Sequence, residues 1–180
     1  GDICSKQQFV MGMLGNTIMN MSINPRAFRD AMGCFASAVT VISTTTADGQ
    51  AVGVTVNSFN SVSLEPPLVL FCLGRDASNF QHFLNSGRFA VNILRQDQDK
   101  VSSGFASDGG NFFQTMENDV SELGNPLVPN ALAMFDCEIE AVHEGGDHVI
   151  LIGRVSELRH DPDGDPLLYY RGRYSSVGSD

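Results

Sequence analysis

Residues Gly53–Cys72 read GVTVNSFNSVSLEPPLVLFC and carry the main fold signal of the sequence. Its two ends are apolar and typical of β-strands. Short polar side chains stand between them, with apolar residues interleaved: Thr55, Asn57, Ser58, Asn60, Ser61 and Ser63. Such residues favour turns and outward strand edges. If the segment instead lies near the core, its polar groups need partners, and a flat ligand rich in nitrogen and oxygen could supply them.

Along the rest of the chain, the sequence predicts many short strands and few helices. We expect helices at residues 24–36, 78–87 and 98–105, and strands at residues 39–45, 51–56, 68–73, 89–94, 133–143 and 148–158. Residues 106–125 contain few apolar anchors and are expected to form a loop or lid.

The first two helices have defined starts. Asn24 suits the cap of the first helix, and Phe28, Met32 and Phe35 are expected to form a buried stripe on it. Ser78 is expected to cap the second helix. Both helices are short, so they are predicted to flank a β-structure and not to form a helical core of their own.

Strands joined by tight turns such as Asp48-Gly49 predict a mainly β fold. We expect an antiparallel β-barrel with helices covering its ends. A parallel doubly wound sheet is disfavoured, because few connections are long enough to hold crossover helices.

Length and charge limit the classes of function. The chain has 180 residues and 42% hydrophobic residues, which favours a single globular domain. Its formal net charge of -10 argues against binding to nucleic acid or to an anionic membrane. An anionic ligand would need local donors that overcome this unfavourable field.

The four cysteines, Cys4, Cys34, Cys72 and Cys137, are scattered and have no metal-ligand spacing. We therefore expect no metal, and reduced thiols in a cytoplasmic protein. No apolar run is long enough to cross a bilayer. Residues 1–22 are expected to form an N-terminal extension of the domain at residues 23–180.

The segment GRDASNFQHF could receive a phosphate. Arg75 offers a guanidinium fork, and Ser78 offers a hydroxyl at an expected helix N-terminus. Taken alone, an ordinary capped surface helix explains the segment equally well.

Five strings occur in unbroken order from about Asn24 to Tyr174: FRDAMGCFASAVTVIST, GVTVNSFNSVSLEPPLVLFCL, ASNFQHFLNSGRFAVNIL, FDCEIEAVHEGGDHVILIGRV and PLLYYRGRY. Together they resemble the short-chain flavin reductases, which supply reduced flavin to two-component monooxygenases. The resemblance implies a Greek-key split β-barrel that binds FMN or FAD, usually as a homodimer with its flavin sites near the subunit interface. The extension and residues 108–120 fit the family least.

The resemblance also implies NAD(P)H:flavin oxidoreductase activity and a set of flavin-binding positions. These are Ser37, Ala38, Val39, Thr40, Thr55, Val56, Asn57, Ser58, Ser61, Val62, Cys72, Leu73, Arg75, Ser78, Asn79 and Phe105. Arg75, Ser78 and Asn79 are expected at the phosphate, and Phe105 is expected to cover a ring.

The Gly146-Asp147-His148 turn matches the family element that faces the flavin and the nicotinamide. His148 is expected to position the NADH or NADPH, with Arg171, Arg173 and Tyr174 near the same mouth. Hydride passes from nicotinamide C4 to flavin N5, so the cofactors carry the reaction and no protein nucleophile is needed. The sequence lacks a strand followed by G-x-G-x-x-G, which disfavours a Rossmann site.

Two other functions remain open from the sequence. The same barrel could be a flavin-holding electron-transfer protein, or a non-catalytic flavin-binding module. Few positive charges surround the expected phosphate site, which favours exchangeable flavin binding.

Overall fold

The computed structural model describes residues 23–107 and 111–178. The expected extension, residues 1–22, lies outside the described residues. Seven strands form the main sheet: β2 (Thr40–Thr45), β3 (Ala51–Val56), β4 (Asn60–Leu64), β5 (Pro67–Gly74), β6 (Arg88–Ile93), β9 (Ala133–Gly145) and β10 (His148–His160). Every pairing among them is antiparallel.

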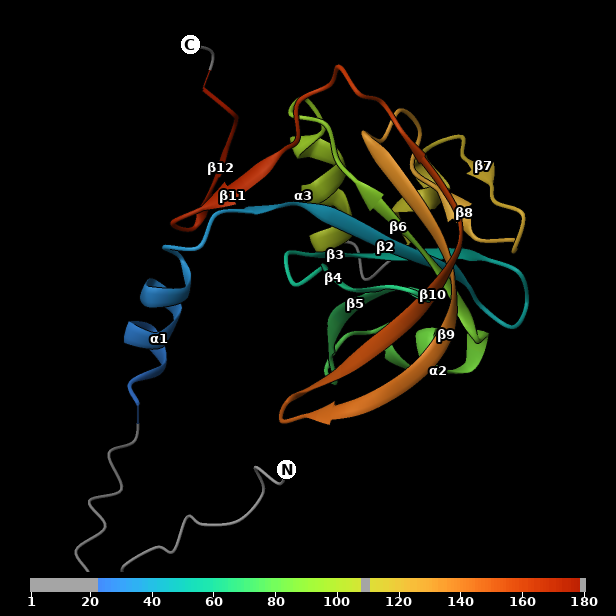
Figure 1. Cartoon of the computed structure of the whole chain (residues 1–180), viewed down its shortest axis with the longest axis horizontal. Helices are drawn as coiled ribbons and strands as arrows, with labels where there is room; N and C mark the ends of the chain where they lie inside the picture. Colours follow the sequence, from blue (N-terminus) through green and yellow to red (C-terminus); the bar gives the residue numbers. More distant parts are fainter. Residues whose placement is uncertain (1–22, 108–110, 179–180) are drawn as a thin grey trace, which may run out of the picture.

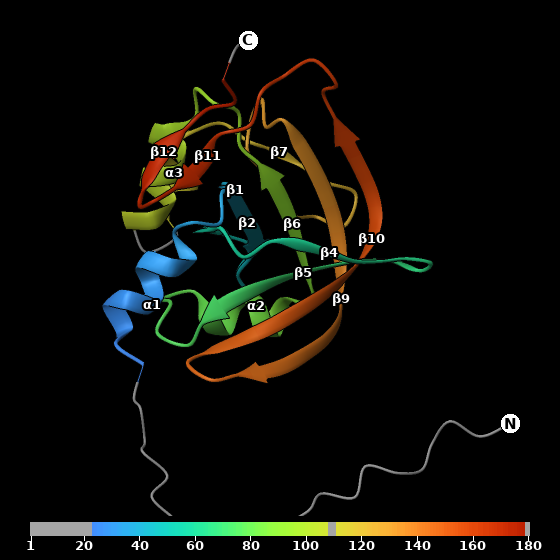
Figure 2. The same cartoon turned by 60° about the vertical axis from the view of Figure 1, so that its left-hand side comes forward.

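The strand order forces this sheet to curl. The order is β3-β2-β6-β9-β10-β5-β4, so β3 and β4 are the two end strands. Laid flat, seven strands at about 4.8 Å spacing would hold these ends roughly 29 Å apart. Residues 57–59, which join β3 to β4, span at most about 14 Å. The sheet therefore wraps into an open barrel (Figure 2), and the expected antiparallel split barrel is confirmed.

Aromatic side chains fill the barrel. Phe71 and Phe89 are fully buried, with ring centroids 4.9 Å apart, and Phe83 packs against Phe71 at 6.0 Å. Phe83 comes from α2 (Phe80–Ser86), which closes one end of the barrel. Gly153 on β10 makes room for them: a Cβ there would lie 2.4 Å from Phe89 Cζ and 2.9 Å from the Cys137 Cβ.

A second core lies under α3 (Asp99–Ser107) and the 3-10 helix η1 (Phe112–Thr115). Phe105 packs there edge-to-face against Phe113, with centroids 4.7 Å apart. Gly53 on β3 lets both rings approach the sheet, since a Cβ there would lie 2.8 Å from Phe105 Cε1. Residues 111–125 are therefore more ordered than the loop predicted from the sequence; they hold η1 and β7 (Asp119–Val120), which pairs with β8 (Pro126–Leu127).

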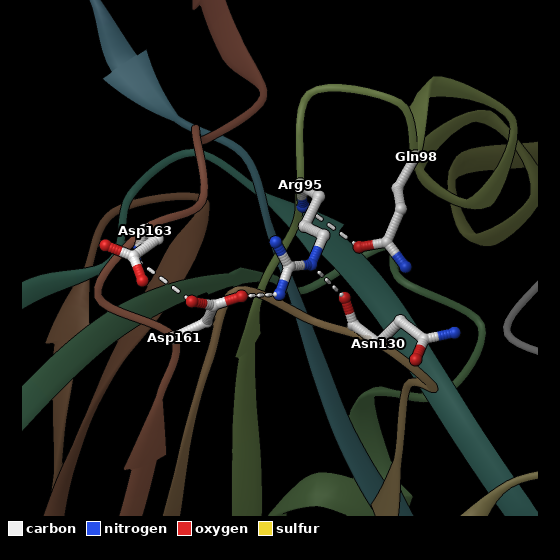
Figure 3. A network of polar contacts seen from close by, with 5 residues as sticks. All are labelled: Arg95, Gln98, Asn130, Asp161 and Asp163. Atoms are coloured by element: carbon white, nitrogen blue, oxygen red, sulfur yellow. Dashed lines mark hydrogen bonds and ion pairs between the residues drawn. The ribbon is translucent and has the colours of Figure 1, made fainter.

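A polar clamp fixes the loops at the other end of the barrel (Figure 3). Arg95 follows β6 and forms an ion pair with Asp161, and its Nε donates to the Asn130 carbonyl at 2.9 Å. Its backbone N–H donates to Gln98 Oε1 at 2.9 Å. The clamp joins three chain segments, and one of them, at Asp161, lies shortly before the C-terminal strands.

The last strands form a small separate sheet. Its order is β1-β11-β12, with bounds Ser37–Ala38, Leu168–Tyr170 and Arg173–Ser175. Main-chain hydrogen bonds attach this sheet to the barrel: Val39 N donates to Leu167 O at 2.8 Å, and Leu94 N to Val39 O at 3.0 Å. The small sheet is the platform from which helix α1 (Pro25–Met32) extends (Figure 1).

The apolar stripe predicted to be buried on the first helix is exposed. Asn24 caps α1 as expected, accepting hydrogen bonds from two backbone N–H groups. However, α1 projects from the barrel with no buried residue, and Phe28, Met32 and Phe35 are 56%, 54% and 66% exposed. Periodicity marks an apolar face, but it does not say which surface covers that face.

Two further predictions need correction. The second helix begins at Phe80, after Asn79, and not at an Ser78 cap. The Asn79 side chain is buried and donates from Nδ2 to the Gly53 carbonyl at 2.8 Å. The central polar stretch does not lie in the core either: β4 is an end strand of the sheet, and Asn60 and Ser61 on it are exposed.

Candidate functional site

A groove of about 820 Å³ lies where α1, the β3–β4 turn and the β11–β12 turn meet. Its lining is part apolar and part polar, and consists of Phe28, Arg29, Asp30, Met32, Gly33, Cys34, Phe35, Ser37, Asn57, Ser58, Phe59, Asn60, Tyr169, Arg171 and Gly172. The opening polar stretch therefore supplies one wall. Four of the sequence-predicted site residues line the groove: Ser37, Asn57, Ser58 and Arg171.

The chain crosses the split of the barrel at Ser58. Pairing of Asn60 with Leu70, continued by two residues, places Ser58 opposite Cys72. There the serine side chain takes the place of main-chain pairing with a neighbouring strand: its Oγ accepts a hydrogen bond from Cys72 N at 2.9 Å and donates one to Cys72 O at 3.3 Å. The hydroxyl that the sequence offered to a ligand is thus used to hold β5 beside the turn.

Two threonine hydroxyls, one on β2 and one in the same stretch, are also used inside the protein. Thr40 Oγ1 donates to the Val56 carbonyl at 3.0 Å, and Thr55 Oγ1 donates to the Ser102 carbonyl at 2.7 Å. These bonds tie β2 to β3 and β3 to α3. They hold the groove wall in place from behind.

Burial divides the remaining predicted flavin positions. Five of them have buried side chains: Val39, Thr40, Leu73, Asn79 and Phe105. Four are half-buried near the split: Ala38, Thr55, Val56 and Cys72. Ser61 and Val62 are exposed on β4. Phe105 lies in the second core at 2% exposure, so its ring has no open face with which to cover a ligand in this conformation.

Arg75 and His148 meet at the tip of the β9–β10 hairpin, outside the lining of the groove. The register pairs His148 with Gly74, and Arg75 N donates to the Asp147 carbonyl at 3.0 Å. The sequence predicted Arg75 as a phosphate ligand, but here its guanidinium forms an ion pair with Glu144. Ser78 is exposed in the turn that follows.

The imidazole of His148 is oriented by its neighbour. His148 Nδ1 lies 2.8 Å from Asp147 Oδ1. This hydrogen bond, reinforced by the charge of the imidazole, holds the pKa of Asp147 below its ordinary value. Asp147 therefore stays a carboxylate in mildly acidic solution and keeps the ring in one orientation.

The C-terminal candidates lie between the groove and α3. Arg171 N donates to the Gly33 carbonyl at 2.9 Å and so connects β11–β12 to the end of α1. The Tyr174 hydroxyl donates to Ser102 Oγ at 2.9 Å, while Arg173 is exposed. The structure thus brings Arg171 to the groove and anchors Tyr174 to α3.

Among the groups that sequence reasoning missed around these sites are two aromatic residues and one carboxylate. Phe59 and Tyr169 line the groove, and Glu144 holds Arg75. The aromatic residues carried no signal beyond strand propensity. Glu144 could have been suspected from its position just before the Gly145-Gly146 turn, but only the β5–β10 register places it beside Arg75.

Comparison with known proteins identifies the family. Residues 32–178 match the family described as "Flavin reductase like domain". The chain belongs to this family. It is 42% identical over 159 residues to the flavin-dependent monooxygenase reductase subunit HsaB of Rhodococcus jostii, covering 88% of this chain and 81% of that relative. It is 41% identical over 151 residues to the FMN reductase (NADH) SmoA of Agrobacterium fabrum, covering 84% and 85%.

Among solved structures, this flavin reductase-like chain resembles Streptomyces globisporus NADH:FAD oxidoreductase SgcE6 in complex with NAD and FAD fragments. The TM-score is 0.81 at 36% identity, covering 87% of this chain and 94% of that one. The expected family, enzyme class and cofactor classes, a flavin and a nicotinamide, are confirmed by these matches. In the described ranges, no helix combines the length and the apolar character needed to span a bilayer.

Proposed function

We propose that this protein is an NAD(P)H:flavin oxidoreductase that reduces FMN or FAD and supplies the reduced flavin to a partner monooxygenase. The observation that carries the proposal is the coincidence of the groove with the sequence-predicted polar stretch, in a chain of the flavin reductase-like family. Relatives named as monooxygenase reductase subunits support the partner.

The groove fits a flavin by its chemistry. Its volume of about 820 Å³ lies in the usual range for cofactor sites. Phe35 and Phe59 offer apolar surface for a ring system, while Asn57 and Ser37 offer short polar groups for its heteroatom edge. The flavin, when bound, supplies an acceptor for hydride from the reduced nicotinamide.

This chain's residues then have binding and orienting roles. Asn57 and Ser37 would hydrogen-bond the flavin, and Ser58 would hold the wall by its bonds to Cys72. The predicted flavin positions whose side chains are buried lie behind the wall. They would contact the flavin through main-chain groups and not through their side chains. His148 would position the nicotinamide, with its ring direction set by Asp147.

A second copy of the chain suits the exposed face of α1. Phe28, Met32 and Phe35 are each more than half exposed beside the groove, and an apolar face of this kind is stabilised by a partner surface. We therefore propose a homodimer that completes the groove. Phe35→Glu should shift the dimer toward monomer in light scattering and weaken flavin binding; dimerisation with unchanged strength would exclude this face.

Free thiols at Cys34, Cys72 and Cys137 support a reducing compartment, and we propose the cytoplasm.

The test is NADH and NADPH oxidation with FMN, FAD or riboflavin added. Turnover that depends on added flavin supports the reductase. Bound flavin that neither nicotinamide reduces would instead favour an electron-transfer or non-catalytic protein. Asn57→Leu should weaken flavin binding more than folding, because it removes hydrogen bonds and adds bulk at an exposed wall position. Unchanged flavin affinity in that variant would place the site elsewhere.

A further inference from the structure

The guanidinium of Arg75 is held by the tip of the β9–β10 hairpin. Its Nε donates to the Gly146 carbonyl at 3.4 Å, and Nη2 forms the ion pair with Glu144. Its Cζ lies over the Phe80 ring, 5.9 Å from the ring centroid. Arg75 is therefore oriented by a carbonyl and a ring as well as by the carboxylate.

Glu144 is the exchangeable part of this arrangement. Its side chain is 82% exposed, while that of Arg75 is 41% exposed. An exposed ion pair is weak and is screened by salt. An incoming anion can therefore displace the carboxylate while the Gly146 carbonyl and the Phe80 ring keep the guanidinium in place.

Glu144 is positioned by strand register and not by chance proximity on the surface. It pairs across the hairpin with Val149, and Val149 pairs with Leu73 on β5. The three strands thus align Glu144 with Leu73, two residues before Arg75, and the two side chains close the remaining distance in their ion pair. The chain carries a net charge of -10, so its acidic side chains outnumber the cationic side chains that could bind an anion. Glu144 neutralises one of these cationic side chains, Arg75.

Arg75 lies three residues beyond Cys72, the main-chain partner of the groove-lining Ser58, so a phosphate that extends from the groove along β5 would reach it. We propose that Glu144 competes with the phosphate group of the flavin for Arg75, and so keeps FMN and FAD exchangeable. The inference rests on the proposed function and adds a specificity-determining residue to it. Competition of this kind acts on phosphorylated flavins and not on riboflavin, which has no phosphate. It lets one site combine phosphate recognition with release of the reduced product.

The experiment compares Glu144→Gln with the unmodified protein. Dissociation constants for FMN and riboflavin are measured by flavin fluorescence at low and high salt. Glu140→Gln is the matched control: it makes the same charge change on the same strand and removes an ion pair with Arg154. Arg75→Gln combined with Glu144→Gln tests whether any gain passes through the guanidinium.

We expect Glu144→Gln to raise the affinity for FMN relative to riboflavin by about two- to fivefold at low salt, the range of one exposed ion pair. High salt should shrink this gain, and the double variant should lack it. A ratio that stays the same, or that moves equally in Glu140→Gln, would overturn the proposal.

The nicotinamide dinucleotide also carries phosphate, so the effect of Glu144→Gln on its binding is measured separately. With riboflavin as acceptor, a fall in the KM for NADH in Glu144→Gln at an unchanged FMN-to-riboflavin ratio would overturn the assignment to the flavin phosphate. Failure of the proposed function has a different signature: the unmodified protein would bind none of the flavins and oxidise neither nicotinamide.

Discussion

Replacing Ser58 by alanine tests how the split of the barrel is held. The serine hydroxyl makes two hydrogen bonds with the main chain of Cys72, at 2.9 Å and 3.3 Å. Alanine removes both and leaves the Cys72 N–H and carbonyl without that partner. It changes little else, because the side chain becomes smaller by one oxygen atom at a half-buried position.

The expected loss of stability follows from the burial of those groups. An unsatisfied buried donor costs about 1–3 kcal/mol. Cys72 is half-buried, so water can replace part of the loss, and we expect a decrease in the free energy of unfolding of about 1–2 kcal/mol. For a chain of this length, that corresponds to a fall in Tm of roughly 2–8 °C.

Urea unfolding followed by circular dichroism measures the change. Ser61→Ala is the control, because Ser61 is exposed on the end strand β4 and should change stability by less than about 0.5 kcal/mol. A Ser58→Ala midpoint that coincides with that of Ser61→Ala would refute the role of the hydroxyl. A lower midpoint together with weaker flavin binding would link the split of the barrel to the groove wall.

Three other predictions concern the core, a thiol and the hairpin. Gly153→Ala should destabilise the barrel by about 1–3 kcal/mol in urea unfolding, because its Cβ would lie 2.4 Å from Phe89 Cζ; a neutral result would mean that the ring shifts freely. Burial, and then the charge of Asp136, raises the pKa of Cys137 to about 12, so native protein should be alkylated at exposed Cys34 and not at Cys137, as read by peptide mass spectrometry. Because that pKa is raised in the folded state, the thiol's contribution to stability is complete below pH 9.0 and is lost as the pH rises toward about 12. His148→Ala should raise the KM for NADH about three- to tenfold, the effect of one lost hydrogen bond, with flavin affinity retained; an unchanged KM would remove His148 from the nicotinamide site.

Local chemistry made several elements predictable. Asp48-Gly49 marked the first hairpin, Asn24 marked the cap of α1, alternating apolar residues marked β9, and the Gly145-Gly146-Asp147 turn marked the start of β10. Each of these signals acts between residues a few positions apart. The antiparallel barrel followed from the number of such hairpins, and the family followed from the order of five strings along the chain.

The hydrogen-bond and ion-pair partners of individual polar groups were not predictable in this way. The sequence offered Ser58, Thr55 and Arg75 as equal candidates for a ligand. The structure uses the hydroxyl of Ser58 to hold β5 and that of Thr55 to hold α3, and it pairs Arg75 with Glu144. The partners lie 14, 47 and 69 residues away, so only closure of the barrel brings them into contact.

Six of the seven strands of the main sheet, the antiparallel class, the family and the polar stretch of the groove wall could be predicted from the sequence, whereas the end strand β4 could not. Which polar groups face that groove, and whether the apolar face of α1 is covered, depend on how the chain closes on itself. The difference lies in how far apart along the chain the interacting residues are. Propensity and periodicity are set by neighbouring residues, whereas hydrogen-bond satisfaction and burial depend on strand register across the whole sheet.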